Sequence, residues 1–143
     1  MIITVGLPGS GKSTYLKQLG VPALSSDELR LMLTDDESEQ AVNQRVFSLL
    51  RYMLRIRLAL ARPVTYVDAT NLSSLERRPF VETAHLYDAE IEALYFDVPL
   101  DVCLERNRRR NRFVPEDVMQ RFALKLAPPA LEEGFSKITV VRS

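Results

Sequence analysis

The sequence is poor in residues that carry disulfide and redox chemistry, with one cysteine, Cys103, among 143 residues. A lone cysteine cannot close an internal disulfide, which excludes a disulfide framework and favours a reducing cytoplasm. Histidine is equally scarce. The single His85 is expected to be a surface or packing residue rather than a catalyst.

Charge of one sign and long apolar runs are also missing. The 19 basic and 19 acidic residues give a net charge of zero, so any attraction to nucleic acid must come from local clusters of charge. No apolar run approaches the roughly 18 residues of a membrane span, and no basic region precedes an apolar one at the N-terminus. We therefore expect no membrane partner and no targeting segment.

The composition and the order of the elements predict an α/β protein with a single domain over residues 1–143. Strands are expected at residues 2–5, 21–25, 64–67, 91–96 and 138–141, with helices between them. This alternation predicts a three-layer sandwich, in which helices flank a five-stranded parallel sheet. We expect the strand order 2-3-1-4-5, with ligands at the carboxyl-terminal edge of the sheet.

The longest helical pattern runs from about residue 39 to residue 61. Its apolar residues form two stripes at helical spacing. One stripe contains Val42, Val46, Leu49, Met53, Ile56 and Leu60, and the other contains Phe47, Leu50, Leu54 and Leu58. The two stripes together predict a helix that is buried over a wide face.

A phosphate-binding loop follows the first strand, where Gly6 to Ser13 read G-x-x-x-x-G-K-S. Glycines in such a loop let backbone N–H groups turn inward, and the following helix adds the positive end of its dipole. Lys12 would reach the β- and γ-phosphates, and the Ser13 hydroxyl would ligate Mg²⁺. The expected ligands are therefore ATP and Mg²⁺, with Gly9, Ser10, Gly11, Lys12, Ser13 and Thr14 as nucleotide-binding residues.

Two carboxylates follow strands that should end beside this loop. Asp68 comes after the apolar run VTYV, where a carboxylate orients Mg²⁺ or its water shell, and Asp27 follows the second strand in SSDELR. Asp27 is a candidate for the base that accepts a proton from an attacking hydroxyl, although an acidic residue in a first helical turn also stabilises the helix. Arg30 lies three residues on, on the same helical face, and could hold an anionic acceptor.

Arginine is concentrated in ERNRRRNRF, which holds Arg106, Arg108, Arg109, Arg110 and Arg112. Arginines on a mobile lid neutralise the charge that develops during phosphoryl transfer. Arg106 and Arg110 are four residues apart and share a helix face, so they are the candidates for this role, in a lid at about residues 105–118. The other three arginines are expected to point elsewhere.

Several stretches together resemble one family over nearly the whole chain. GLPGSGKST, SSDELR, VDATNLSSLERR, FDVPLDVCLERNRRR and EEGFSKITVV look like the 5′-hydroxyl polynucleotide kinase domains of phage and bacterial end-healing enzymes. The resemblance implies transfer of the ATP γ-phosphate to the 5′-hydroxyl end of RNA or DNA. The phosphatase and ligase modules that often accompany such domains have no counterpart here, so a kinase module alone is expected.

The resemblance also implies roles for individual residues. Lys12 and Ser13 would hold the phosphates and Mg²⁺, Asp27 would be the general base, and Arg30 would contact the acceptor phosphate nearest the 5′ end. Asp68, Thr70 and Asn71 would line the acceptor side. Arg106 and Arg110 would be lid arginines on the ATP phosphates. Arg77 and Arg78 also match the family, without an assigned contact.

Two other functions share the loop and the fold. A small-molecule kinase of the gluconate, shikimate or antibiotic type is consistent with zero net charge and with the acidic segment at residues 34–40, which is expected to be a solvated loop. A nucleotide-binding or ATPase module without an acceptor would need neither Asp27 nor Arg30. In every case the phosphate loop binds a nucleotide.

Overall fold

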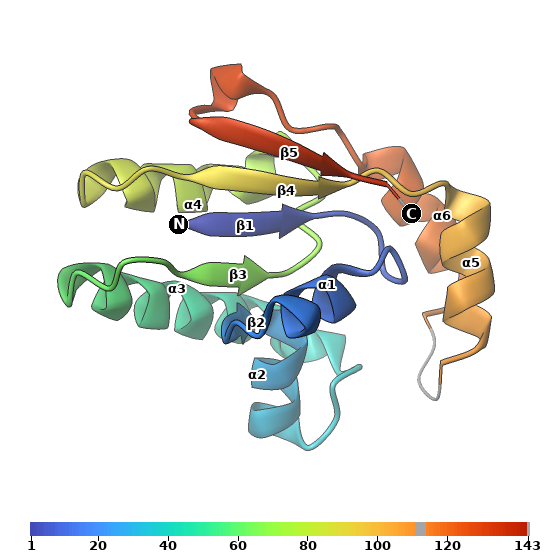
Figure 1. Cartoon of the computed structure of the whole chain (residues 1–143). Coiled ribbons are helices and arrows are strands. Elements are labelled where there is room, and N and C mark those ends of the chain that lie inside the picture. Colours follow the sequence, from blue (N-terminus) through green and yellow to red (C-terminus); the bar gives the residue numbers. More distant parts are fainter. Residues whose placement is uncertain (111–113, 143) are drawn as a thin grey trace.

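A five-stranded parallel sheet forms the centre of the computed structural model, which describes residues 1–110 and 114–142 (Figure 1). The strand order is β2-β3-β1-β4-β5, as predicted from the sequence. The strands are β1 (Ile2–Val5), β2 (Ala23–Ser25), β3 (Tyr66–Asp68), β4 (Glu92–Phe96) and β5 (Lys137–Val141). β3 begins and ends later than expected, so that Asp68 is its last residue rather than the residue after it.

Six α-helices are described, and they connect the strands in the expected alternation. They are α1 (Lys12–Leu19), α2 (Ser26–Thr34), α3 (Asn43–Ala59), α4 (Ser74–Leu86), α5 (Leu100–Arg108) and α6 (Glu116–Lys125). Two short 3₁₀ turns, η1 (Gln40–Val42) and η2 (Leu131–Glu133), precede α3 and β5.

Local signals set the helix ends. The Ser25 hydroxyl accepts a hydrogen bond from the Glu28 N–H at the start of α2, and the Ser73 hydroxyl accepts one from the Glu76 N–H at the start of α4. Gly20 ends α1 in the left-handed conformation, which a glycine adopts without a steric cost. These caps fix where α2 and α4 begin, and therefore where their polar side chains lie relative to the sheet.

The two faces of the sheet are covered by different helices. Alternate strand residues such as Ile3 and Ala93 pack with apolar residues of α3 and α4 in one cluster. Their neighbours Ile2 and Leu94 belong to a second cluster with Leu16 of α1. Because successive side chains of a strand point to opposite faces, α1 lies on one side of the sheet and α3 and α4 on the other. The predicted three-layer sandwich is confirmed.

The wide buried face predicted for residues 39–61 is only partly correct. Val46, Leu50 and Leu54 of α3 are fully buried, whereas Ile56 and Leu60 are 45% and 67% exposed. The helix also starts later, at Asn43, because η1 occupies residues 40–42. The buried line of Val46, Leu50 and Leu54 draws on both predicted stripes, and the opposite side of the helix remains open to solvent and to the cleft described below.

A buried arginine ties α4 to the segment that follows β3. Arg77 is fully buried, and its guanidinium donates two hydrogen bonds to the Glu133 carboxylate, at 2.8 and 3.0 Å. A third nitrogen, Nη1, donates to the carbonyls of Asn71 (2.8 Å) and Leu72 (3.0 Å). Arg77, which the sequence left without a contact, therefore holds the 69–72 segment against η2. Arg78, its neighbour, is exposed.

Replacing Arg77 with alanine should lower the free energy of unfolding by about 3–5 kcal/mol, because the Glu133 carboxylate and two carbonyls would lose their partner in a buried site. Urea unfolding followed by circular dichroism measures this change. Arg78→Ala, an exposed substitution in the same helix, is the matched control and should change stability by less than about 0.5 kcal/mol.

The same ion pair should make stability depend on pH. Burial by itself raises the pKa of Glu133, but hydrogen bonds from Arg77 and from the Ala130 N–H outweigh it and lower the pKa below the ordinary value of 4.5. A carboxylate with a lowered pKa stabilises the fold above its unfolded-state pKa, and this stability is lost as the pH falls through the folded-state pKa. The stability difference between the wild type and Glu133→Gln should therefore shrink below about pH 4.5; a constant difference would contradict the assignment.

Candidate active site

The phosphate-binding loop joins β1 to α1 at the carboxyl-terminal edge of the sheet (Figure 1). Gly9 and Gly11 have φ angles of 81° and 97°, a conformation that favours glycine. A side chain at Gly9 would also come within 2.8 Å of the Cys103 carbonyl oxygen, so the loop packs directly against α5. Backbone geometry thus explains Gly9 and Gly11, two of the three glycines of the loop.

Lys12 lies inside the loop and is 8% exposed. Its Nζ donates hydrogen bonds to the carbonyl oxygens of Gly6 (3.0 Å) and Leu7 (2.7 Å). Burial lowers the pKa of Lys12 from 10.5 to about 8, while the carboxylates of Asp68 and Asp27 act in the opposite direction. The ammonium group is thus held where further negative charge would stabilise it.

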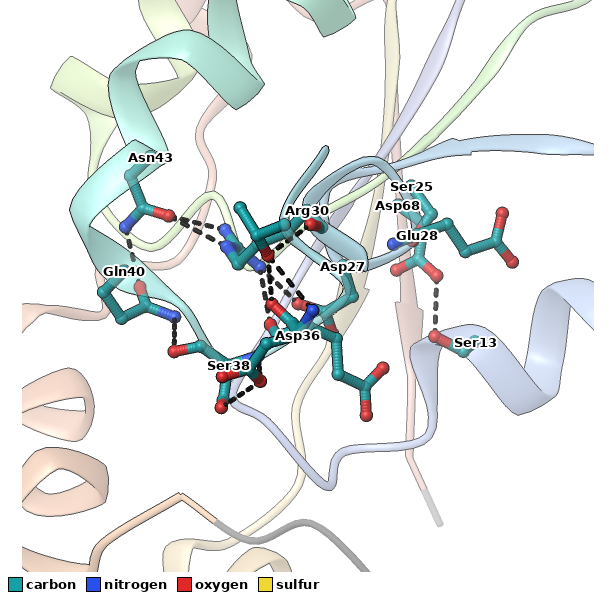
Figure 2. Close-up of polar contacts among 12 residues, drawn as sticks. Ser13, Ser25, Asp27, Glu28, Arg30, Asp36, Ser38, Gln40, Asn43 and Asp68 are labelled. Carbon is teal, nitrogen blue, oxygen red and sulfur yellow. Dashed lines mark hydrogen bonds and ion pairs between the residues drawn. The ribbon is translucent and has the colours of Figure 1, made fainter. Parts of the chain in front are cut away.

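Ser13, in the first turn of α1, lies within hydrogen-bond distance of Asp68, the last residue of β3. The Ser13 hydroxyl donates to Asp68 Oδ2 at 2.7 Å, and Asp68 is buried (Figure 2). No cluster of three or more acidic, histidine or cysteine side chains suited to a metal occurs among the described residues. One hydroxyl and one carboxylate nevertheless fit Mg²⁺ beside a nucleotide, because this ion usually keeps several waters and takes its other ligands from phosphates.

Asp27 and Arg30 form an ion pair at the start of α2. Arg30 Nη1 donates to Asp27 Oδ1 at 2.7 Å; the Arg30 side chain is 5% exposed, whereas that of Asp27 is 47% exposed. The shared helix face predicted for them is confirmed. Arg30 Nε and Nη2 both donate to Asn43 Oδ1, at 3.1 and 2.6 Å, so Asn43 anchors the guanidinium from the first residue of α3.

The acidic segment 34–40 is largely exposed to solvent, as its composition predicted, but it also makes specific contacts. It folds back against α2 through local hydrogen bonds (Figure 2). Asp36 Oδ1 accepts from the N–H and hydroxyl of Ser38, and the Glu37 carbonyl accepts from Arg30 Nη1 at 3.4 Å. Gln40 Oε1 accepts from Asn43 Nδ2 at 2.7 Å. The segment therefore contributes one carbonyl to the Arg30 guanidinium and one hydrogen bond to Asn43, which holds it.

The arginines of the expected lid fall into two groups. Arg106 Nη1 donates to the Gly9 carbonyl at 3.3 Å, and both Arg106 and Arg110 line the cleft that contains the phosphate loop. Arg108 and Arg109 are exposed and pair with glutamates of α5 and α6. Arg112 lies outside the described residues, as do parts of the lid range 105–118. The cleft lining separates Arg106 and Arg110 from Arg108 and Arg109, as the sequence predicted, but the shared helix face was wrong, because α5 ends at Arg108 and Arg110 lies beyond it.

Thr70 and Asn71 lie shortly after Asp68; Thr70 contacts the loop after β1, and Asn71 contacts β1 itself. The Gly6 N–H donates to the Thr70 carbonyl at 2.9 Å. Asn71 is buried, and its Nδ2 donates to the Thr4 carbonyl at 2.8 Å. The Asn71 side chain thus holds the residues after β3 against β1. Its expected contact with an acceptor remains a prediction.

All of the predicted site residues line one cleft of about 1640 Å³. They are Gly9, Ser10, Gly11, Lys12, Ser13, Thr14, Asp27, Arg30, Asp68, Thr70, Asn71, Arg106 and Arg110. The cleft also contains Asn43, Phe47 and Arg51 of α3, which no motif indicated. No sequence signal indicated Asn43, because the helix was expected to begin at about residue 39, and Arg51 stood among the charged residues of an amphipathic pattern.

The chain resembles known kinases in sequence and in fold. It is 27% identical over 136 residues to the L-seryl-tRNA(Sec) kinase of Methanococcus maripaludis, which covers 90% of this chain and 53% of that protein. A chain in the solved Pnkp1/Rnl/Hen1 RNA repair complex superposes with a TM-score of 0.73 at 26% identity, covering 87% of this chain and 43% of that one. This chain therefore spans about half the length of these relatives.

A gluconokinase from Sinorhizobium meliloti 1021 shares the fold across 99% of this chain and 81% of its own, with a TM-score of 0.65 and 20% identity. Across the described residues, no helix combines the length and the apolar character that crossing a membrane requires. The sheet order, the phosphate loop and these neighbours define a P-loop kinase fold that binds a nucleotide. A family model described as the AAA domain matches residues 1–129, and the chain belongs to that family.

Proposed function

We propose that the chain is an ATP-dependent polynucleotide kinase that transfers the γ-phosphate to a 5′-hydroxyl end of RNA or DNA. The observation that carries the proposal is the Asp27–Arg30 pair. A buried arginine holds a half-exposed carboxylate in the same cleft as the phosphate loop. A module that only bound or hydrolysed a nucleotide would not need this carboxylate on the acceptor side.

The donor half of the reaction uses the loop and the lid. Lys12 and the loop N–H groups hold the ATP phosphates, and Arg106 and Arg110 compensate the charge of the transferring group. Ser13 and Asp68 would hold Mg²⁺, directly or through water. When bound, that ion neutralises phosphate oxygens and orients them for in-line transfer.

The acceptor half depends on Asp27. As the 5′ oxygen attacks the γ-phosphorus, a new P–O bond forms and the bond from that phosphorus to the β–γ bridging oxygen breaks. The hydroxyl proton passes to the Asp27 carboxylate, and ADP leaves with the electron pair. Arg30 keeps the carboxylate oriented for this transfer through the 2.7 Å hydrogen bond.

Two of the similar proteins, one found by sequence and one by structure, support a nucleic-acid acceptor. The relatives with 26–27% identity are named for a tRNA substrate and for an RNA repair complex. The gluconokinase, at 20% identity, supports the fold alone. Salt separates the two acceptor classes, because turnover of an oligonucleotide should fall steeply with ionic strength and turnover of a sugar should not.

Replacing Asp27 with asparagine should lower kcat for a 5′-hydroxyl oligonucleotide by about 10²–10⁴-fold, with little change in the KM for ATP, because the base acts only on the acceptor proton. Transfer of labelled γ-phosphate into DNA, RNA and simple sugars measures the change. Glu28→Gln, an exposed charge loss at the next position and outside the cleft, is the matched control.

Three results would argue against this assignment. Label that enters a sugar but no nucleic-acid end would indicate a small-molecule kinase. ATP loss without any labelled product, unchanged by Asp27→Asn, would indicate an ATPase. Equal losses in kcat and in ATP affinity would mean that Asp27 supports the nucleotide site rather than the acceptor.

Nucleotide binding should be coupled to protonation of Lys12. With a pKa of about 8 in the free protein, about nine-tenths of Lys12 would be neutral at pH 9, and bound phosphates favour the charged form. Binding of ADP should therefore take up nearly one proton at about pH 9 and much less at about pH 7.5. Calorimetry in buffers of different ionisation enthalpy measures the uptake; a value that does not rise with pH would contradict this coupling.

A further inference from the structure

Three residues of α3 present a row of side chains to the cleft. Asn43, Phe47 and Arg51 are each four residues apart, so they lie on one face of the helix, and all three line the cleft. Asn43 is engaged with Arg30, and Phe47 is partly buried and offers an apolar surface. The row leads away from the Asp27–Arg30 pair along the helix axis.

Arg51 is the member of this row without a partner. It is only partly exposed, yet it makes no hydrogen bond or ion pair within the described part of the chain. Arg77, Arg108 and Arg109 differ, because each pairs with a glutamate, and the exposed Arg45 and Arg78 differ because they lie outside the cleft. A guanidinium that faces a cleft without an anion is suited to an anionic group of a ligand.

Distance decides which part of the ligand Arg51 could reach. Eight helical residues separate it from Asn43, which corresponds to about 12 Å along α3. Asn43 itself holds the Arg30 guanidinium, because its Oδ1 accepts a hydrogen bond from Arg30 Nη2 at 2.6 Å. A group at Arg51 is therefore well beyond the phosphate assigned to Arg30, and a small hydroxyl compound that reacts beside Asp27 would not span the gap.

We propose that Arg51 binds a backbone phosphate of the acceptor strand beyond the phosphate nearest the reacting end. The acceptor is then a strand of several nucleotides, which runs along the Asn43–Phe47–Arg51 face of α3. Phe47 would give an apolar surface for a base between the two arginines. This inference rests on the proposed function, because it describes the acceptor side of the same reaction.

The test compares acceptors that differ in their number of phosphates. A nucleoside 3′-monophosphate carries only the phosphate assigned to Arg30, whereas oligonucleotides of two to six nucleotides extend towards Arg51. Arg51→Gln should leave kcat/KM for the monophosphate unchanged and lower it about tenfold or more for the longer strands. Parallel RNA and DNA series identify which strand type supplies the phosphate.

Salt provides a second measure that loss of folding would not reproduce. The loss of one phosphate contact should flatten the plot of log(kcat/KM) against log[salt] by about 0.7 for a single strand. Arg45→Gln removes the same charge from an exposed position of α3 outside the cleft, and should change neither the slope nor the length dependence. Arg51→Lys keeps the charge and should retain most of the slope.

The outcomes separate the two proposals. If the wild type phosphorylates 5′-hydroxyl ends but Arg51→Gln loses the same factor on every acceptor, or loses nothing on any, the inference is wrong and the kinase proposal stands. If the wild type phosphorylates no nucleic-acid end, both fail. An equal ATP KM and an unchanged circular dichroism spectrum confirm that the variant is folded.

Discussion

Three cations of the described residues are buried around the cleft, and the need to satisfy each of them fixes the loops that form it. Lys12, Arg30 and Arg77 are 8%, 4% and 0% exposed. A buried charge is tolerated only with partners close by. Carbonyl oxygens of the loop after β1 accept hydrogen bonds from Lys12. Arg30 donates to Asp27 and Asn43, and Arg77 donates to Glu133 and to the carbonyls after β3. The hydrogen bonds of these three cations therefore position the segments that form the site.

The three sets of partners differ in what they leave for a ligand. Arg77 makes a bidentate ion pair with the Glu133 carboxylate, so its role is structural. Among the described residues, Lys12 has only neutral oxygens within hydrogen-bond distance, and burial lowers its pKa. Arg30 is intermediate, because its guanidinium holds a half-exposed carboxylate. The demand for negative charge is therefore greatest at the phosphate loop, where a nucleotide would supply it.

The sequence predicted the parts of the molecule that depend on local spacing. The parallel sheet followed from the alternation of strands and helices. Lys12, Ser13 and Asp68 followed from motifs at strand ends, because parallel strands bring their carboxyl ends to one edge. Contacts between distant segments were beyond its reach. Arg77 meets Glu133 across 56 residues, and Arg30 meets Asn43 through a turn whose acidic composition suggested only a solvated loop. The exposure of Ile56 and Leu60 on α3 was mispredicted for the same reason, because it depends on which distant segments pack against the helix.

Placement of the arginines reconciles zero net charge with a polyanionic ligand. Glutamates neutralise Arg108 and Arg109 on the outer surface of α5 and α6, and Glu133 neutralises Arg77 in the interior. Arg51, Arg106 and Arg110 instead line the cleft. Electrostatic attraction acts over about 10 Å at moderate salt, so charges that are paired elsewhere contribute little inside the cleft. A balanced sequence can therefore present a locally cationic surface. That surface runs from the phosphate loop past Arg30 to α3, which is the direction that the proposed acceptor strand would follow.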